Sequence, residues 1–326
     1  MPMAFSVIRS SRGLIRPLEQ TPSGILDLSV IDRLPVLRCN ARTLHVFRHG
    51  PEAAQVIREA LSKALVPYYP LAGWLKESSQ GQLQIECSAQ GVLFVEASAD
   101  CTLDTMQVTQ FECGGFVIGL IFCHTICDGL GAAQFLNAVG EIARGHEHPS
   151  TTPVWCRDFS PLPPQQEKMN TLPLLPPPMP NYRLQHANID ISLDQIKQVK
   201  TEFHDSTGQM CSTFEALLEP PLPKGFYGNC FFPVTITASS ETVARASNVE
   251  VIKLIQEAKE WGRLGFNQVD YGWGPPVHIV PIQGSSVIPV GIVGSLPLPG
   301  KGIRLMTWCV EEVHRQPFID QMMKVI

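Results

Sequence analysis

The sequence predicts an α/β protein of two domains, and three observations support this prediction. Segments with the alternating pattern of half-buried strands are interleaved with segments whose apolar residues recur at helical spacing. The chain has 326 residues, 44% of them hydrophobic, which is enough for one large core or two smaller ones. Residues 161–180 are rich in proline, which lacks an amide proton and fixes φ, so neither a helix nor a central strand is expected there. We therefore predict an N-terminal domain over residues 1–160, a crossing linker over 161–180 and a C-terminal domain over 181–326.

The expected N-terminal domain alternates between helices and strands. Residues 54–66 place Val56, Ile57 and Leu61 on one helical face, and Pro67 ends that helix. Strand-like segments follow over residues 82–88, 92–98, 106–113 and 116–123, and a second helix is expected over 129–145.

The expected C-terminal domain opens with an alternating strand, and Ser192 with Gln195 then forms a capping box for a helix. Its strand-like segments are 184–192, 228–240, 287–299 and 303–312, with a helix over 248–260. Another helix begins at Cys211 but stops at Pro220, which is unusually early for a capped apolar segment.

Charge and composition exclude several classes of partner. The formal net charge is −5 and Lys and Arg form no cluster, so we expect neither a nucleic-acid nor a membrane-surface partner. Three arginines (Arg9, Arg12 and Arg16) interrupt the N-terminal segment, and no apolar run reaches transmembrane length. We therefore expect a cytosolic protein that acts as a monomer.

The ten cysteines are spread along the chain, which predicts reduced thiols rather than a disulfide framework. Cys123 and Cys127 flank His124, but a structural zinc site usually combines two close pairs of ligands and no second pair exists. We expect no metal.

The most informative motif lies between the apolar segment 116–123 and the next helix. There the chain reads His124-Thr-Ile-Cys-Asp128-Gly129, so a histidine leaves a strand for a loop, where scaffolds present chemistry. A neutral imidazole at this position could take a proton from an alcohol or an amine. Two other interpretations remain open from the residues alone, namely a structural core histidine and a thiol nucleophile at Cys127.

Four ordered motifs resemble those of the plant BAHD acyl-CoA-dependent acyltransferases. HTICDG at 124–129 is similar to the His-x-x-x-Asp-Gly motif, and DYGWG at 270–274 is similar to Asp-Phe-Gly-Trp-Gly, with Tyr271 for Phe. YPLAG at 69–73 and FYGN at 226–229 match two further stretches in the same order. Grass enzymes that resemble hydroxycinnamoyl transferases, and taxane and benzyl-alcohol acyltransferases, are the most similar members.

The resemblance implies two domains of chloramphenicol-acetyltransferase type with an active-site channel between them. It implies that His124 is the general base that deprotonates an alcohol, which then attacks the thioester of acyl-CoA, a co-substrate; no permanently bound cofactor or metal is implied. It also implies structural roles for the rest of both motifs. These residues are Asp128, Gly129, Asp270, Gly272, Trp273 and Gly274.

The chain departs from the family by being about a quarter shorter, and the missing segments are internal. The resemblance places gaps after Asp104, after Leu218 and after Lys259. The second gap removes the arginine that pairs with the motif aspartate, so Asp128 needs another cation, for which Lys224, Arg263 and Arg304 are the candidates. The alternative to an active acyltransferase is therefore a non-catalytic or misfolded remnant of one, from a decayed gene, a splice form or an error in the gene model.

Overall fold

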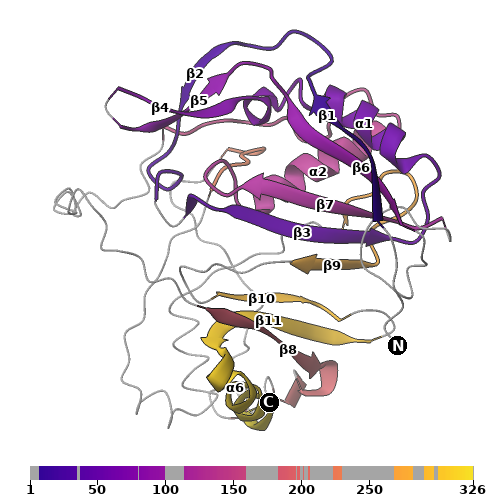
Figure 1. The fold of residues 1–326 in the computed structure, drawn as a ribbon, viewed down its shortest axis with the longest axis vertical. Coiled ribbons are helices and arrows are strands. Elements are labelled where there is room, and N and C mark those ends of the chain that lie inside the picture. The colour runs from indigo at the N-terminus through magenta and orange to yellow at the C-terminus, as the bar shows by residue number, and fades with distance from the viewer. Residues whose placement is uncertain are drawn as a thin grey trace. The chain divides into compact units, whose positions relative to one another are not determined.

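The computed structural model describes residues 7–34, 37–79, 81–99, 114–158, 183–195, 197–198, 201, 205, 223–229, 268–281, 290–296 and 300–325 (Figure 1). The chain divides into two compact units. The first comprises Met1–Pro164, Pro220–Cys230 and Leu264–Gln283, and the second comprises Gln165–Glu219, Phe231–Arg263 and Gly284–Ile326.

The described residues of the first unit form three small antiparallel sheets and two α-helices. Its strands are β1 (Val7–Ile15), β2 (Gly24–Asp27), β3 (Asn40–Phe47), β4 (Trp74–Glu77), β5 (Leu83–Cys87), β6 (Val92–Ala99), β7 (Phe116–Cys123) and β9 (His278–Pro281). Its helices are α1 (Ala53–Ala64), the short 3-10 helix η2 (Tyr69–Ala72) and α2 (Gly129–Ala143). The strand orders are β1-β6, β2-β5-β4 and β7-β3-β9.

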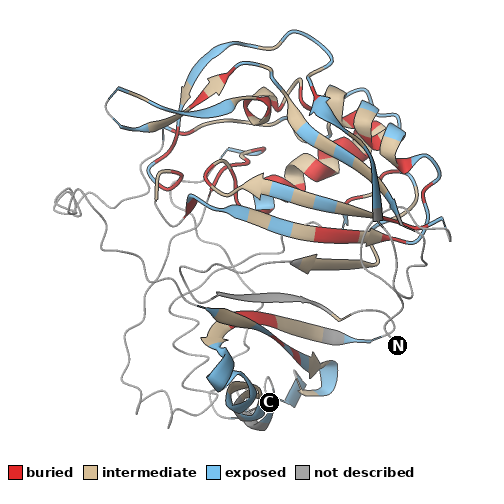
Figure 2. Ribbon diagram, in the orientation of Figure 1, coloured by how far each residue is buried: buried red, intermediate tan, exposed pale blue. Residues whose placement is uncertain are grey.

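The core of the first unit lies where α1 and α2 pack on the β7-β3-β9 sheet. On β3 and β7, Phe47 and Phe116 are paired partners, and their rings stack with centroids 4.6 Å apart. Figure 2 shows buried residues gathering on α2 and in the middle of β3. The apolar spacing of both helices is thus explained, because each turns its apolar face to this sheet or to the other helix.

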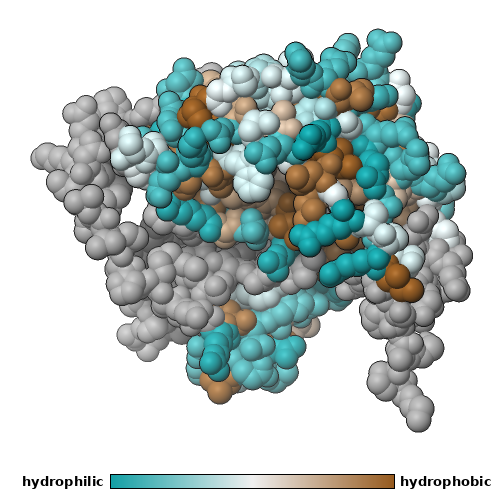
Figure 3. All heavy atoms as spheres, turned by 45° about the horizontal axis from the view of Figure 1, so that its top comes forward, coloured by the Kyte–Doolittle hydropathy of each residue, from teal (hydrophilic) through white to brown (hydrophobic). Residues whose placement is uncertain are grey.

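The β1-β6 ribbon covers α1 with one face and leaves the other in solvent. Arg58 of α1 forms an ion pair with Glu96 of β6 and lies over the ring of Phe94. On the outer face Leu14 and Leu93 are direct partners, and both are exposed. Figure 3 shows one face of the molecule, on which apolar patches lie among hydrophilic residues.

The second unit is described through β8 (Leu184–Ser192), β10 (Val290–Ser295), β11 (Gly302–Glu311) and α6 (Glu312–Val325). The sheet order is β10-β11-β8 with antiparallel pairs, and α6 contacts β8 and β11. The predicted capping box is present, because Gln195 Oε1 accepts from the Ser192 amide at 2.9 Å and Ser192 Oγ accepts from the Gln195 amide at 3.3 Å.

The structure differs from the expected domain boundary at two segments. The first is Pro220–Cys230, which carries FYGN and packs in the first unit. The expected C-terminal domain carries DYGWG, whereas residues 268–281 pack in the first unit. There β9 pairs with β3, and Trp273 lies edge-on against Phe116 at 5.8 Å between centroids. Each of the two units is therefore built from several separate segments of the chain. The whole of the expected linker, 161–180, lies outside the described residues, as do the segments 106–113 and 248–260 and all of 228–240 beyond Asn229.

None of the helices in the described part of the chain is long and apolar enough to cross a membrane.

One buried histidine of this core predicts a pH dependence of stability. His45 is 1% exposed, its Nε2 lies 2.9 Å from Thr43 Oγ1, and burial lowers its pKa from 6.5 to about 4. Between these pH values the unfolded chain binds the proton and the folded chain does not, so stability falls as the pH is lowered below 6.5. We expect the free energy of unfolding to be ~2 kcal/mol lower at mildly acidic pH than at neutral pH, and we expect a His45→Gln variant to lack this difference. Thermal unfolding of both proteins at the two pH values checks this, and parallel losses in both would contradict it.

Candidate active site

His124 lies in the turn that follows β7, where the chain crosses to α2. Its backbone amide donates to Cys39 O at 2.9 Å, which continues the β3–β7 pairing one residue beyond the strand. The side chain is half-buried. The strand therefore presents this imidazole from a rigid backbone, as the sequence predicts.

Asn229 fixes the orientation of the imidazole. Its Nδ2 donates to Asp32 Oδ1 at 2.7 Å and to His124 O at 2.8 Å, so its Oδ1 is the end that faces His124 Nδ1, at 3.1 Å. An amide oxygen only accepts, so Nδ1 of the imidazole must carry the proton. The lone pair of the neutral ring is then on Nε2, which leaves that atom able to accept a proton.

Asp32 holds the Asn229 amide in place from the protein interior. It is 0% exposed, and its Oδ2 accepts from the Ser29 amide at 3.1 Å. The same oxygen lies 2.8 Å from Nε of Arg157, and the two side chains are 0% and 2% exposed. A buried carboxylate is costly unless it is paired and hydrogen-bonded, and Asp32 is both.

Arg157 connects that carboxylate to the backbone of the His124 loop. Its Nη2 donates to Ile126 O at 3.0 Å, and its guanidinium lies 4.0 Å from the ring centroid of Trp155. Burial lowers the pKa of Arg157, and the charge of Asp32 opposes that shift. A Cβ on Gly228 would overlap the guanidinium, so glycine fits beside Arg157 without displacing the ion pair.

Asp128 is the N-cap of α2. It is 5% exposed, and its Oδ1 accepts from the Gly131 amide at 3.0 Å. Gly129, the first residue of the helix, is also buried. The aspartate thus shapes the turn from His124 into the helix. Of the cations considered from the sequence, Lys224 is exposed, Arg304 pairs with Asp190 in the second unit, and Arg263 lies outside the described residues.

Cys127 does not have the character of a nucleophile. The thiol is 4% exposed, and burial raises its pKa, with the charge of Asp128 adding to the effect. A thiol must ionise to attack, so this environment keeps it inert. In the described part of the chain, no three His, Cys, Asp or Glu side chains form a group that could bind a metal ion.

The second motif forms a tight turn. Asp270 Oδ1 accepts from the amides of Gly272 and Gly274, at 2.8 and 2.9 Å. Both glycines have positive φ, 106° and 91°, which explains why the turn needs them. Tyr271 and Trp273 pack against the rings of β3 and β7. These contacts are structural, and the expected channel between the two domains stays a prediction.

Three residues of the site did not stand out in the sequence. In the sequence Asn229 is only the last residue of FYGN, and no recognised motif contains Asp32 or Arg157. The available signals were a lone aspartate among apolar residues at 28–34 and an arginine beside Trp155. Neither signal identifies the partner, because Asp32 and Asn229 are 197 residues apart in the chain.

Removing Arg157 should destabilise the protein strongly, because the Asp32 carboxylate would then be buried without its cation. We expect Arg157→Met to cost ~3–5 kcal/mol and Asp32→Asn combined with it to recover part of the loss. Arg304→Met is the matched control, since its pair with Asp190 is partly exposed and should contribute at most ~1 kcal/mol. Urea unfolding measures all three, and equal costs for the two arginines would refute the argument.

Substitutions of Asp128 distinguish between two roles for this carboxylate, as a helix cap and as a member of a buried ion pair. Asp128→Ala removes the acceptor for the Gly131 amide and should cost ~1–2 kcal/mol, whereas Asp128→Asn keeps an oxygen there and should cost less. Thermal unfolding at neutral pH compares them. A loss of ~3–5 kcal/mol in the Asn variant would instead show that a cation pairs with the carboxylate.

Comparison with known proteins identifies the family of this chain. The model of the family described as "Transferase family" matches residues 5–106 and 103–218. Acyl transferase 4 of Oryza sativa subsp. japonica is 36% identical, with 98% of this chain and 99% of that protein covered. That alignment spans 439 residues against a chain of 326, and both ends match, so the shortfall is internal.

Solved structures share the fold at low sequence identity. Vinorine synthase superposes with a TM-score of 0.66 at 18% identity, covering 98% of both chains. TRI101 of F. graminearum, in complex with coenzyme A and T-2 mycotoxin, gives 0.57 at 9% identity over 92% of this chain and 98% of that one. The architecture is that of the CoA-dependent acyltransferases. With its motifs, its matched family model and its rice relative, the chain belongs to the BAHD acyltransferase family of plants.

Proposed function

We propose that this protein transfers an acyl group from an acyl-CoA to a hydroxyl group of a small plant metabolite, with His124 as the general base. The observation that carries the proposal is the Asn229 contact, which holds the His124 proton on Nδ1 and leaves Nε2 as the basic atom. A base with this tautomer is what deprotonation of an alcohol requires.

The proposed reaction needs no covalent enzyme intermediate. His124 Nε2 takes the hydroxyl proton as the acceptor oxygen attacks the thioester carbonyl. The tetrahedral intermediate then expels the CoA thiolate, and the imidazolium returns the proton to that sulfur. Asn229 supports the imidazolium throughout, because its oxygen accepts from Nδ1 in both protonation states.

Family membership supports acyl transfer, and the finer assignments are part of the proposal. The complex of TRI101 with coenzyme A supports acyl-CoA as the donor. We propose a hydroxyl rather than an amine acceptor because an alcohol, unlike a neutral amine, gains most of its nucleophilicity from a base. A hydroxycinnamoyl group is the proposed acyl unit, and the protein is proposed to act as a cytosolic monomer.

The second candidate is a chain that has lost catalysis. The internal gaps in the alignment with the rice relative favour it, since about a quarter of the family's usual length is missing. The contacts around His124 support the active enzyme, because the described residues bring the imidazole, its orienting amide and the buried ion pair together.

Activity of the purified protein decides between them. We expect acyl transfer from at least one of several acyl-CoA donors to alcohol acceptors, and His124→Ala should lower kcat/KM by roughly 10²–10⁴-fold. Cys127→Ala is the matched control in the same loop and should retain most activity. Full activity of the His124 variant would exclude it as the base, whereas loss in the Cys127 variant alone would restore the thiol nucleophile.

A further inference from the structure

The segment of residues 223–229 brings Asn229 to His124, although 105 residues separate the two in the chain. Helix α2 begins directly after the loop that His124 opens, so the helix is a common reference for both partners. The side of α2 that meets the segment carries Gly131 and, one turn later, Gln134. Neither residue takes part in the proposed reaction, so their effect on the site must come from how they hold the segment.

Gln134 joins α2 to this segment through its side-chain amide. Its Nε2 donates to Gly225 O at 2.9 Å and to the Tyr68 hydroxyl oxygen at 3.1 Å, and the side chain is half-buried. A carbonyl oxygen only accepts, so the nitrogen end of the amide must face Gly225. The same carbonyl accepts from the Val154 amide at 2.9 Å. Two different parts of the first unit therefore hold one carbonyl group at the start of the segment.

Two glycines allow the segment to lie this close to its neighbours. A Cβ on Gly131 would overlap the carbonyl of Tyr227, and a Cβ on Gly225 would overlap the carbonyl of Thr152. Gly225 also has a positive φ of 90°, which strains other residues. The segment thus lies directly against the backbone of α2, and its distance from the helix is set by this backbone contact together with the Gln134 hydrogen bond.

The residues between Gly225 and Asn229 connect this hydrogen bond to the candidate base. Phe226 forms a parallel bridge with Val154, and Tyr227 is buried in the core. At the end of the stretch, the Asn229 amide is held by its own hydrogen bonds. Because packed side chains fix each step, a shift of the Gly225 carbonyl is passed along the backbone to Asn229.

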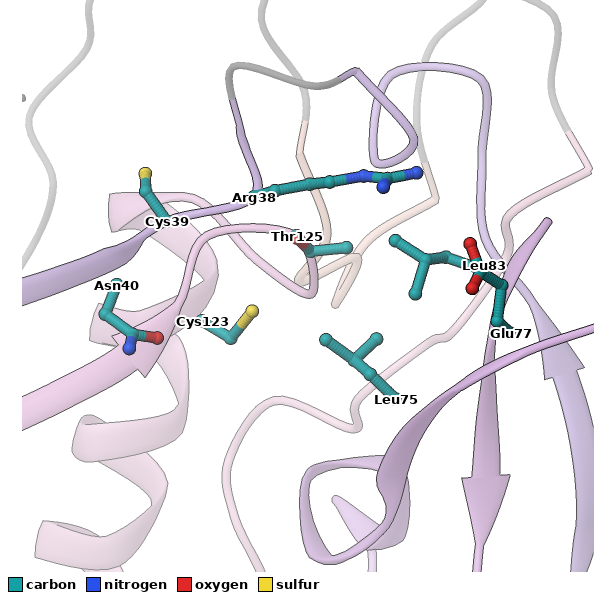
Figure 4. Close-up of a pocket in the computed structure, with 8 residues that line it drawn as sticks. All are labelled: Arg38, Cys39, Asn40, Leu75, Glu77, Leu83, Cys123 and Thr125. Atoms are coloured by element: carbon teal, nitrogen blue, oxygen red, sulfur yellow. The ribbon is translucent and has the colours of Figure 1, made fainter. Parts of the chain in front are cut away.

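The backbone of His124 is held from another side. Its amide donates to Cys39 O at 2.9 Å, and the hydroxyl of the buried Thr125 donates to Leu37 O at 3.0 Å. Thr125 also lines the pocket drawn in Figure 4, between the start of β3 and the β4–β5 hairpin, and none of the described residues that line it comes from α2 or from the segment. A displaced segment would therefore move Asn229 Oδ1 relative to an imidazole whose backbone stays in place.

We propose that Gln134 is a positioning residue for His124. Its hydrogen bond to Gly225 O sets the place of Asn229 Oδ1 opposite Nδ1, and so keeps the ring proton on that nitrogen. A neutral imidazole that loses its acceptor at Nδ1 can carry the proton on either nitrogen, and a ring with the proton on Nε2 cannot accept a hydroxyl proton there. The inference rests on the proposed function for the role of His124 as base, but the tautomer exists with or without acyl transfer.

Nitrogen-15 NMR of the purified full chain with labelled histidines tests the proposal without chemistry, because protonated and unprotonated ring nitrogens give distinct signals. A His124→Gln variant identifies the signals of His124. At a pH where the ring is neutral, we expect the wild-type protein to carry the proton on Nδ1. In Gln134→Met, which removes both donors, the two nitrogen signals should move toward each other as the tautomers mix. Gln134→Glu keeps the volume of the side chain without the donors and should have the same effect, so it carries the test if the Met variant does not fold.

Two control variants separate positioning from a general loosening of the core. Tyr68→Phe removes the other partner of Gln134 and leaves the bond to Gly225, so the tautomer should stay as in the wild type. Gln55→Met makes the same chemical change on α1, where the exposed amide donates to Glu59 at 2.7 Å, and it should have no effect. An unchanged tautomer in the Gln134 variants, or equal mixing in Tyr68→Phe, would overturn the proposal. Thermal unfolding shows whether each variant is folded.

Steady-state kinetics then tests the consequence for the reaction. In an active enzyme, Gln134→Met should lower kcat by roughly ten- to a hundredfold at a nearly unchanged KM, since a small misplacement of a catalytic group is costly. Tyr68→Phe should retain most of kcat. A raised KM with kcat unchanged in the Gln134 variant would overturn the positioning role. Tautomer mixing in a protein that transfers no acyl group would support that role and count against the proposed function.

Discussion

The buried ion pair of Arg157 with Asp32 is the interaction on which the candidate site depends. Asp32 holds the amide of Asn229, and that amide decides which nitrogen of His124 carries the proton. Arg157 also binds the carbonyl of Ile126, in the loop that His124 begins. Four segments that are far apart in the chain therefore meet at one pair of charges, and the orientation of the His124 imidazole follows from their contacts.

Burying two charges is not an efficient way to stabilise a fold. Apolar side chains of the same volume often do as well or better, because the ions must be taken out of water. The protein offsets part of that cost by enclosing the guanidinium among the rings of Trp155, Phe226 and Tyr227 and by hydrogen-bonding the carboxylate. A pair of this kind is better explained by orientation than by stability. A carboxylate fixes the direction of an amide, which an apolar residue cannot do.

Local sequence patterns predicted the elements of this site but not its connections. The helical spacing behind α1 and α2, the apolar segment of β7 and the capping box at Ser192 depend on residues close in sequence, and the structure contains all of them. The contact of His124 with Asn229 joins residues 105 apart, and no periodicity encodes it. The turn at Asp270 was expected in the C-terminal domain because its position in the chain is late. Local patterns do not encode the pairing of β9 with β3, which brings this segment into the first unit.

The internal gaps and the contacts that orient His124 lie in different parts of the chain. The expected gaps follow Asp104, Leu218 and Lys259, and each of these positions lies outside the described residues. Each group that orients His124 belongs to the first unit and is in place there. A scaffold that only needed to fold would gain little from a buried ion pair, because the pair costs desolvation and contributes mainly direction. That the ion pair lies behind the amide that orients the His124 ring therefore supports the proposal of an active enzyme over that of a catalytic remnant.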